Sequence, residues 1–228
     1  MQTIFIPGHL CDGRLYAPQI GTRPDAVIAD VTRDDSIAAM AARLLDTAPD
    51  RFVLAGLSMG GMVAMEVMAR APDRVAGALL MATDPTAARP KEIAWRAGER
   101  AKVAEGGLAA FARPFAAMFF AHDTAVAARL DPEVAAMQDA ADTALYTRQS
   151  DALDGRRDLL DALAGCPVPV EILAGREDRI CPPVLHERLA GVLPQARLDI
   201  LPGCGHLISL ERPQAVERAL ARLEHAAV

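Results

Sequence analysis

The sequence has few aromatic side chains and no long apolar run. Only 4% of its 228 residues are aromatic although 52% are hydrophobic, which predicts a large core built mainly from Ala, Val and Leu. No run approaches the roughly 18 apolar residues that cross a bilayer. The opening MQTIFIPG also lacks the basic start and the long apolar stretch of a secretory signal. We therefore expect a cytoplasmic protein that does not bind a membrane.

The sequence also lacks the usual signals for charged partners and for cofactors. The formal net charge is -6 and the cations are mostly isolated Arg residues, so no basic stripe is available to bind nucleic acid. The four cysteines form no CxxC pair and have no metal-like spacing to histidine, which predicts free thiols and no metal site. Phosphate-loop and dinucleotide-binding patterns are missing as well. We expect a small-molecule partner and no cofactor, and the oligomeric state stays open.

Short β-branched runs alternate with longer helical patterns along the chain. This alternation is typical of βαβ units around a parallel sheet, and the length suits one α/β domain. The third run is too apolar to have a solvated face and should be central in the sheet, and Ser36 should cap the helix after the second run. The six predicted strands are Thr3–Pro7, Ala26–Val31, Arg51–Leu57, Arg74–Thr83, Pro169–Gly175 and Ala196–Gly203.

The strand signal disappears between Asp84 and about Leu163, where Ala-rich helical segments follow one another. We predict a helical insertion over residues 85–163, which divides the core domain into residues 1–84 and 164–228. The Phe and Met side chains of the insertion either line an apolar pocket or form the insertion's own core. The candidate substrate contacts among them are Phe111, Phe115, Met118, Phe119 and Tyr146.

A single polar hydroxyl follows the third predicted strand, in the stretch LAGLSMGGMVAMEVM. Ser58 is the centre of a G-x-S-x-G pattern, between Gly56 and Gly60. A residue that joins a strand to a helix without a loop takes a strained backbone conformation, and neighbours without a Cβ relieve the crowding. The pattern predicts that Ser58 presents its hydroxyl above the sheet as a nucleophile. The alternative is a small-residue turn that packs a helix on a strand.

A serine nucleophile needs a base, and His206 is the best placed of the five histidines. It follows the last predicted strand in PGCGHLISLERP, at the sheet edge where α/β proteins place reacting groups. His9 competes with it because it follows the first strand, although we expect His9 to contribute a backbone donor instead. The other three lie in helical patterns or at the tail and should be at the solvated surface: His122, His186 and His225.

The base in turn needs an acid that holds its tautomer. Asp178 follows the fifth strand in LAGREDRICPP, just before the strand that delivers His206, so we choose it. Asp84, directly after the fourth strand, is the alternative acid. For both residues the non-catalytic alternative is an Asp that only forms a turn. Glu177 should point away if its neighbour Asp178 points in.

Acyl transfer also requires backbone N–H groups that stabilise an oxyanion. One donor should be Met59, which follows the nucleophile at the start of its helix. The second should come from the loop PGHLCDG after the first strand, with His9 as first choice and Leu10 as second. A simple turn at Gly8 is the other interpretation of this loop.

These residues together resemble the α/β-hydrolase superfamily, in particular its small bacterial members with a helical lid. The resemblance rests on the G-x-S-x-G elbow, the turn GRED that ends at Asp178, and GCGHLISLERP with His206, in this order along the chain. It implies a doubly wound, mostly parallel sheet of six strands that lacks the family's first two. It also implies that the segment Ala152–Leu163 closes the lid. One departure is Pro7-Gly8, where family members usually carry His-Gly.

The predicted site suggests a serine hydrolase that forms an acyl-enzyme and cleaves small to medium apolar carboxylic esters. The same scaffold also serves C–C bond hydrolases, enol-lactonases, thioesterases and cofactor-free haloperoxidases. A ligand receptor that does not turn over, or a purely structural domain, are the alternatives outside catalysis. Three cysteines lie near the predicted loops, and we expect small buried side chains at turn positions: Cys11, Cys181 and Cys204. The alternative for Cys204 is a thiol whose alkylation blocks His206.

Overall fold

The computed structural model describes residues 1–121 and 124–226 and has a parallel sheet of six strands at its centre. The strand order is β2-β1-β3-β4-β5-β6, and every neighbouring pair is parallel. The six predicted strands and the central place of the third are therefore confirmed. The strands are β1 (Thr3–Ile6), β2 (Val27–Ile28), β3 (Phe52–Leu57), β4 (Val75–Met81), β5 (Val170–Gly175) and β6 (Ala196–Leu201).

The second strand is shorter than the predicted Ala26–Val31. Only Val27 and Ile28 pair, with Ile4 and Phe5 of β1. This strand lies at the edge of the sheet and Val27 is 43% exposed, so little apolar burial holds a longer pairing in place.

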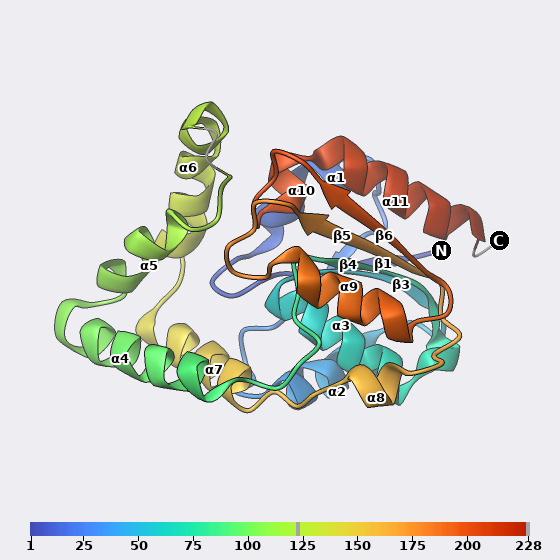
Figure 1. Cartoon of the computed structure of the whole chain (residues 1–228), viewed down its shortest axis with the longest axis horizontal. Helices are drawn as coiled ribbons and strands as arrows, with labels where there is room; N and C mark the ends of the chain where they lie inside the picture. The colour runs from blue at the N-terminus through green and yellow to red at the C-terminus, as the bar shows by residue number, and fades with distance from the viewer. Residues whose placement is uncertain (122–123, 227–228) are drawn as a thin grey trace.

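Successive strand residues face opposite layers of helices, as the two-residue period of a strand requires. In β3, Phe52 and Leu54 pack with one core cluster while Val53 and Leu57 pack with the other. Figure 1 shows the two helical layers on either side of the sheet. One contains α2 (Ile37–Thr47), α3 (Met59–Arg70), α8 (Leu160–Leu163) and α9 (Pro183–Val192), and the other η1 (Gly13–Tyr16), α1 (Ala17–Ile20), α10 (Ile208–Glu211) and α11 (Pro213–Ala226).

The helix that follows Ser58 is almost entirely buried, which holds the end of β3 in place. All residues of α3 from Met59 to Met68 are buried, and Met65 and Met68 have no exposed surface. Burying a Met side chain contributes about 1.5–3 kcal/mol, so this helix is anchored far more by packing than by its propensity. Ser36 caps α2 as predicted, since its hydroxyl accepts a hydrogen bond from the N–H of Ala39.

Between β4 and β5 the chain forms a run of helices. They are α4 (Pro90–Gly106), α5 (Ala109–Ala116), α6 (Thr124–Asp139) and α7 (Thr143–Asp154), followed by α8; the short η2 (Pro72–Arg74) precedes β4. Figure 1 shows α4 to α7 on the side of the sheet toward which the strands point. Leu163 of α8 is fully buried against the core, whereas α4 to α7 extend beyond the sheet. In the described part of the chain no helix is long and apolar enough to cross a membrane.

Candidate active site

Ser58 lies at the turn where β3 passes directly into α3. Its backbone has φ 57 and ψ -118, in the left-handed half of conformational space that L-residues rarely adopt. The flanking glycines make this bend sterically allowed: a Cβ on Gly56 would collide with the backbone of Gly60, and a Cβ on Gly60 with the carbonyl oxygen of Ile6. The Ser58 N–H is held by the carbonyl oxygen of Met81 at 2.9 Å. The G-x-S-x-G spacing is therefore a steric requirement of this turn.

His206 and Asp178 form a buried hydrogen-bonded pair. Nδ1 of His206 is 2.8 Å from Oδ2 of Asp178, and the side chains are 4% and 0% exposed. The other carboxylate oxygen accepts hydrogen bonds from the N–H groups of Ile180 and Cys181 at 2.8 and 3.0 Å. Burial alone would raise the pKa of Asp178, but the nearby His206 and these N–H donors lower it below its ordinary value. Asp178 is thus an ionised acceptor that holds the ring of His206.

Close backbone packing brings the loops of this pair together. A Cβ on Gly175 would collide with the carbonyl oxygen of Gly205, where the loops after β5 and β6 touch, and a Cβ on Gly205 would collide with the backbone of the insertion at Phe119. The carboxylate of Glu211 accepts hydrogen bonds from the N–H groups of Gly205 and Leu207, at 2.9 and 3.0 Å. These two bonds clamp the residues on either side of His206.

The alternative acids lie elsewhere in the hydrogen-bond network. Asp84 accepts from the N–H and hydroxyl of Thr86, at 2.9 and 2.7 Å, and its second oxygen faces Arg156 at 3.3 Å. Glu177 points away from the imidazole and accepts from the N–H of Cys204 at 3.0 Å. Neither carboxylate contacts His206.

The two loops expected to supply oxyanion donors flank Ser58. Met59 is the first residue of α3, and an N–H at that position has no intrahelical acceptor. The N–H of Leu10 is already donated to Oε1 of Gln149 at 2.8 Å. Among the described residues no hydrogen bond uses the N–H of His9. Of the two candidates in this loop, His9 therefore has the available donor.

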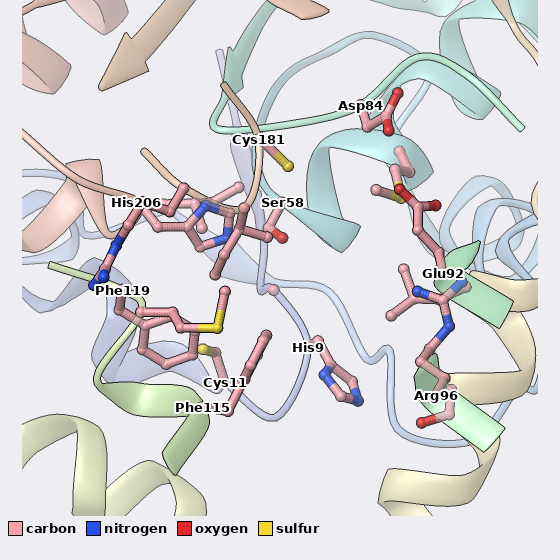
Figure 2. Close-up of a pocket in the computed structure, with 18 of the residues that line it drawn as sticks. His9, Cys11, Ser58, Asp84, Glu92, Arg96, Phe115, Phe119, Cys181 and His206 are labelled. Atoms are coloured by element: carbon pink, nitrogen blue, oxygen red, sulfur yellow. The ribbon is translucent and has the colours of Figure 1, made fainter. Parts of the chain in front are cut away.

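A cavity of about 350 Å³ joins these groups. Ser58 and His206 both line it, and Figure 2 shows their side chains projecting into the same space. Within the described residues no hydrogen bond joins the Ser58 hydroxyl to the imidazole, a contact that is often loose in unliganded sites. All five candidate contacts from the insertion line the cavity: Phe111, Phe115, Met118, Phe119 and Tyr146. Other insertion side chains pack into the core instead, among them Phe120 and Met137.

Comparisons with known proteins identify the family of the chain. A model of the alpha/beta hydrolase family matches residues 4–219. The chain belongs to the alpha/beta hydrolase family. It is 31% identical over 202 residues to a pimeloyl-[acyl-carrier protein] methyl ester esterase of Aromatoleum aromaticum. The aligned region covers 80% of this chain and 77% of that protein. Esterase relatives of this kind support its assignment as a hydrolase.

Solved structures show the same fold at lower sequence identity. A thermophilic esterase from Thermogutta terrifontis has a TM-score of 0.86 at 23% identity, over 100% of this hydrolase and 91% of that chain. The enol-lactonase from Burkholderia xenovorans has a TM-score of 0.84 at 22% identity, over 98% and 91%. The predicted fold class and the predicted superfamily are both confirmed.

The hydrolase cavity has a second, charged wall that the sequence interpretation missed. Figure 2 shows His206 and Phe119 on one side of Ser58, and Glu92 and Arg96 on the other. This wall comes mainly from α4 and from the chain around Arg156, whose guanidinium contacts Glu92 and Asp84. Helical periodicity could not reveal this wall, because charged residues occur all around α4. Only the packing of the insertion decides which of them face the cavity.

The histidine predictions met different outcomes. The surface prediction for His186 is wrong: it is 0% exposed, and its Nε2 accepts a hydrogen bond from the N–H of Thr83 at 2.9 Å. A helical position alone did not reveal that α9 turns this residue into the core beside the end of β4. Burial lowers the pKa of His186 to about 4, so the ring is neutral. His225 is exposed as predicted, and His122 lies outside the described residues.

The cysteines near the site are free thiols, and burial suppresses their ionisation. Cys11 and Cys181 line the cavity, whereas Cys204 has no exposed surface and is not among the lining residues. Burial raises the pKa of Cys11 to about 12, and it raises those of Cys181 and Cys204 as well. Among the described residues no cluster of His, Cys, Asp or Glu could hold a metal ion.

Proposed function

We propose that this hydrolase cleaves carboxylic esters through an acyl-enzyme on Ser58, with His206 as base and Asp178 as its orienting acid. The observation that carries the proposal is the buried 2.8 Å bond between His206 and Asp178, beside the cavity that Ser58 also lines. An ionised carboxylate on Nδ1 keeps the proton of the neutral ring on that nitrogen. Nε2 is then free to accept a proton from the serine hydroxyl.

The reaction proceeds in two halves. Ser58 Oγ attacks the ester carbonyl carbon while Nε2 of His206 takes its proton, and the N–H groups of Met59 and His9 stabilise the resulting oxyanion. Collapse breaks the bond to the alcohol, which leaves with the proton from His206. Water then gives its proton to the same imidazole and attacks the acyl-enzyme, and the bond to Ser58 breaks as the imidazole returns that proton to Oγ and the acid is released. Losing one oxyanion donor would cost about 2.7–4 kcal/mol of transition-state stabilisation.

The lining of the cavity supports an apolar portion of the substrate next to the reacting groups. The rings of Phe111, Phe115 and Phe119 follow one another, with centroids 4.9 and 5.1 Å apart, and Phe119 stacks on His206 at 5.9 Å. The volume of about 350 Å³ lies within the range of small-molecule sites and suits a small to medium acyl group. The pimeloyl ester esterase among the relatives agrees with this reaction class.

A two-part experiment tests the proposal. A series of p-nitrophenyl esters of increasing acyl length should be hydrolysed by the wild type and not by Ser58→Ala, and a fluorophosphonate should label Ser58 alone. Conversion of Ser150→Ala, a serine that also lines the cavity, provides a matched control that should still be labelled at Ser58. Labelling without turnover of any ester would instead favour a receptor. If Ser58 is not labelled and no ester is hydrolysed, the proposed mechanism is wrong.

A further inference from the structure

Four buried polar atoms in the wall of the cavity have no hydrogen-bond partner outside this group, in which the hydroxyl of Tyr146 lies beside that of Ser150. They are Nε2 of His9, Nη2 of Arg96, the hydroxyl of Tyr146 and the hydroxyl of Ser150. Arg96, Tyr146 and Ser150 are 8%, 1% and 0% exposed, so bulk water does not satisfy them. A buried donor without an acceptor costs about 1–3 kcal/mol, so a group of such atoms at one site is unusual for packing alone. We call these residues the polar cluster.

The members of the polar cluster lie together, away from His206. Tyr146 and Ser150 are one turn apart on α7, so they share a face of that helix. The rings of His9 and Tyr146 have centroids 5.8 Å apart. Burial lowers the pKa of His9 to about 3 with a further contribution from the charge of Arg96, which places the guanidinium near this neutral ring. All four residues line the cavity, and Figure 2 shows His9 and Arg96 on the side of Ser58 opposite His206.

The ion pair of Arg96 engages its Nε and leaves Nη2 without a hydrogen-bond partner among the described residues. Its Nε is paired with Asp154, but Arg100 shares the same carboxylate at 2.8 Å. Asp151, the second partner of Arg100, is 52% exposed and therefore strongly screened by water. Two guanidinium groups thus share the carboxylate of Asp154, and Glu92 and Glu99 are further carboxylates near the cluster. The neighbouring Arg156, in contrast, contacts two carboxylates of its own.

We propose that the polar cluster binds a carboxylate at the remote end of the substrate, so that the preferred substrate is a half-ester of a dicarboxylic acid. The proposal rests on the proposed ester hydrolysis at Ser58. Guanidinium N–H groups only donate hydrogen bonds, and the two hydroxyls donate readily to an anionic oxygen. A remote ammonium group would face the charge of Arg96 instead. The apolar rings between the two ends accommodate the methylene chain.

Two substrates that differ by one methyl group test this inference on the wild type. Monomethyl adipate carries a free carboxylate, and dimethyl adipate carries the same chain without charge. A hydrogen bond to a charged group contributes roughly 1.5–3 kcal/mol, so kcat/KM for monomethyl adipate should exceed that for dimethyl adipate by about tenfold to a hundredfold, after correction for its two ester bonds. The difference should appear mainly in KM, because the remote group takes no part in bond breaking.

Variants then assign the preference to the polar cluster. Arg96→Met should abolish the preference, because it should lower kcat/KM for monomethyl adipate far more than kcat/KM for dimethyl adipate. Arg96→Lys keeps the charge and should retain part of the preference, and Tyr146→Phe should reduce it. Arg113→Met removes an exposed arginine from α5 and is the matched control that should leave the preference intact.

The outcomes separate this inference from the proposed function. If the wild type hydrolyses p-nitrophenyl acetate but uses dimethyl adipate at least as well as monomethyl adipate, the remote carboxylate site is wrong and the esterase proposal stands. A preference that survives Arg96→Met would also overturn the site. If Arg96→Met does not fold, the wild-type ratio and Tyr146→Phe decide. Failure to hydrolyse any ester overturns both proposals.

Discussion

Replacing Asp178 by Asn removes the charge that orients His206 and alters little else in the shape of the site. The retained amide oxygen can still accept from the N–H groups of Ile180 and Cys181, which now hold Oδ1 at 2.8 and 3.0 Å. The new amide nitrogen then faces Nδ1 of His206, where the carboxylate lies at 2.8 Å. An amide donates at that position, so Nδ1 becomes the acceptor and the proton of the neutral ring moves to Nε2.

This tautomer presents an N–H to Ser58 and cannot remove its proton. In a serine protease the equivalent change lowers kcat by about 10⁴, which corresponds to roughly 5 kcal/mol in the activation free energy. We expect a loss of this size in kcat for p-nitrophenyl butyrate, with KM nearly unchanged. Asp84→Asn is the comparison, since Asp84 also follows a strand but contacts Thr86 and Arg156. Its effect on kcat should be much smaller.

The same variant should also change how stability depends on pH. The pKa of Asp178 is lowered in the folded state, so its ionised form stabilises the fold above the unfolded pKa and this contribution is lost as the pH falls. Urea unfolding of Asp178→Asn should therefore show a smaller decrease in unfolding free energy between neutral and acid pH than the wild type. Nearly full activity in Asp178→Asn, together with a large loss in Asp84→Asn, would refute the assignment of the orienting acid.

Three further predictions follow from the same packing. Gly60→Ala should lower the free energy of unfolding by several kcal/mol, because the new Cβ would collide with the carbonyl oxygen of Ile6. The control is Gly98→Ala, at a position inside α4 with open space around it, which should raise the free energy of unfolding in urea by about 0.5–1 kcal/mol. Burial lowers the pKa of His186 from 6.5 to about 4, so the stability that the neutral ring contributes above pH 6.5 is lost as the pH falls toward 4. In His186→Gln the amide oxygen can still accept the hydrogen bond from the N–H of Thr83, so the variant should lose only this part of the pH dependence of the unfolding free energy. An unchanged pH profile would contradict this prediction. Glu211→Gln replaces one of two acceptor oxygens at Gly205 and Leu207, so it should cost about 1–3 kcal/mol of stability and lower kcat through His206; unaltered unfolding and kcat would show that this clamp is unimportant.

The parts of the fold and site that could be predicted depend on local sequence. Ser58 was recognisable because a strained turn needs glycine on both sides, and a Cβ at Gly56 or Gly60 would indeed collide with the backbone. His206 and Asp178 were recognisable because each follows a predicted strand, and parallel strands end at one edge of the sheet. The sequence patterns at these positions span only a few residues, although the backbone that excludes a Cβ at Gly60 belongs to Ile6.

The parts that could not be predicted depend on residues far apart in the sequence. The N–H of Leu10 was a candidate oxyanion donor, but Gln149, 139 positions away, accepts its hydrogen bond. His186 was predicted at the surface because it lies in a helical pattern, and the partner that holds it in the core, Thr83, lies 103 positions away. The polar cluster depends on the packing of α4 against α7, which a periodic pattern does not specify. In each case the deciding contact is tertiary.

The insertion helps to build the reactive centre as well as to cover it. The carbonyl oxygen of Phe119 accepts a hydrogen bond from the N–H of His206 at 2.6 Å, so a residue of the insertion holds the loop of the base. On the other side of Ser58, Gln149 of α7 holds the loop that offers His9 as oxyanion donor, and its amide also reaches Val31 beyond β2. The insertion segments that line the cavity therefore also hold both loops around Ser58. Changes of substrate preference by substitution in the insertion should preserve these two contacts, since losing either one alters kcat together with specificity.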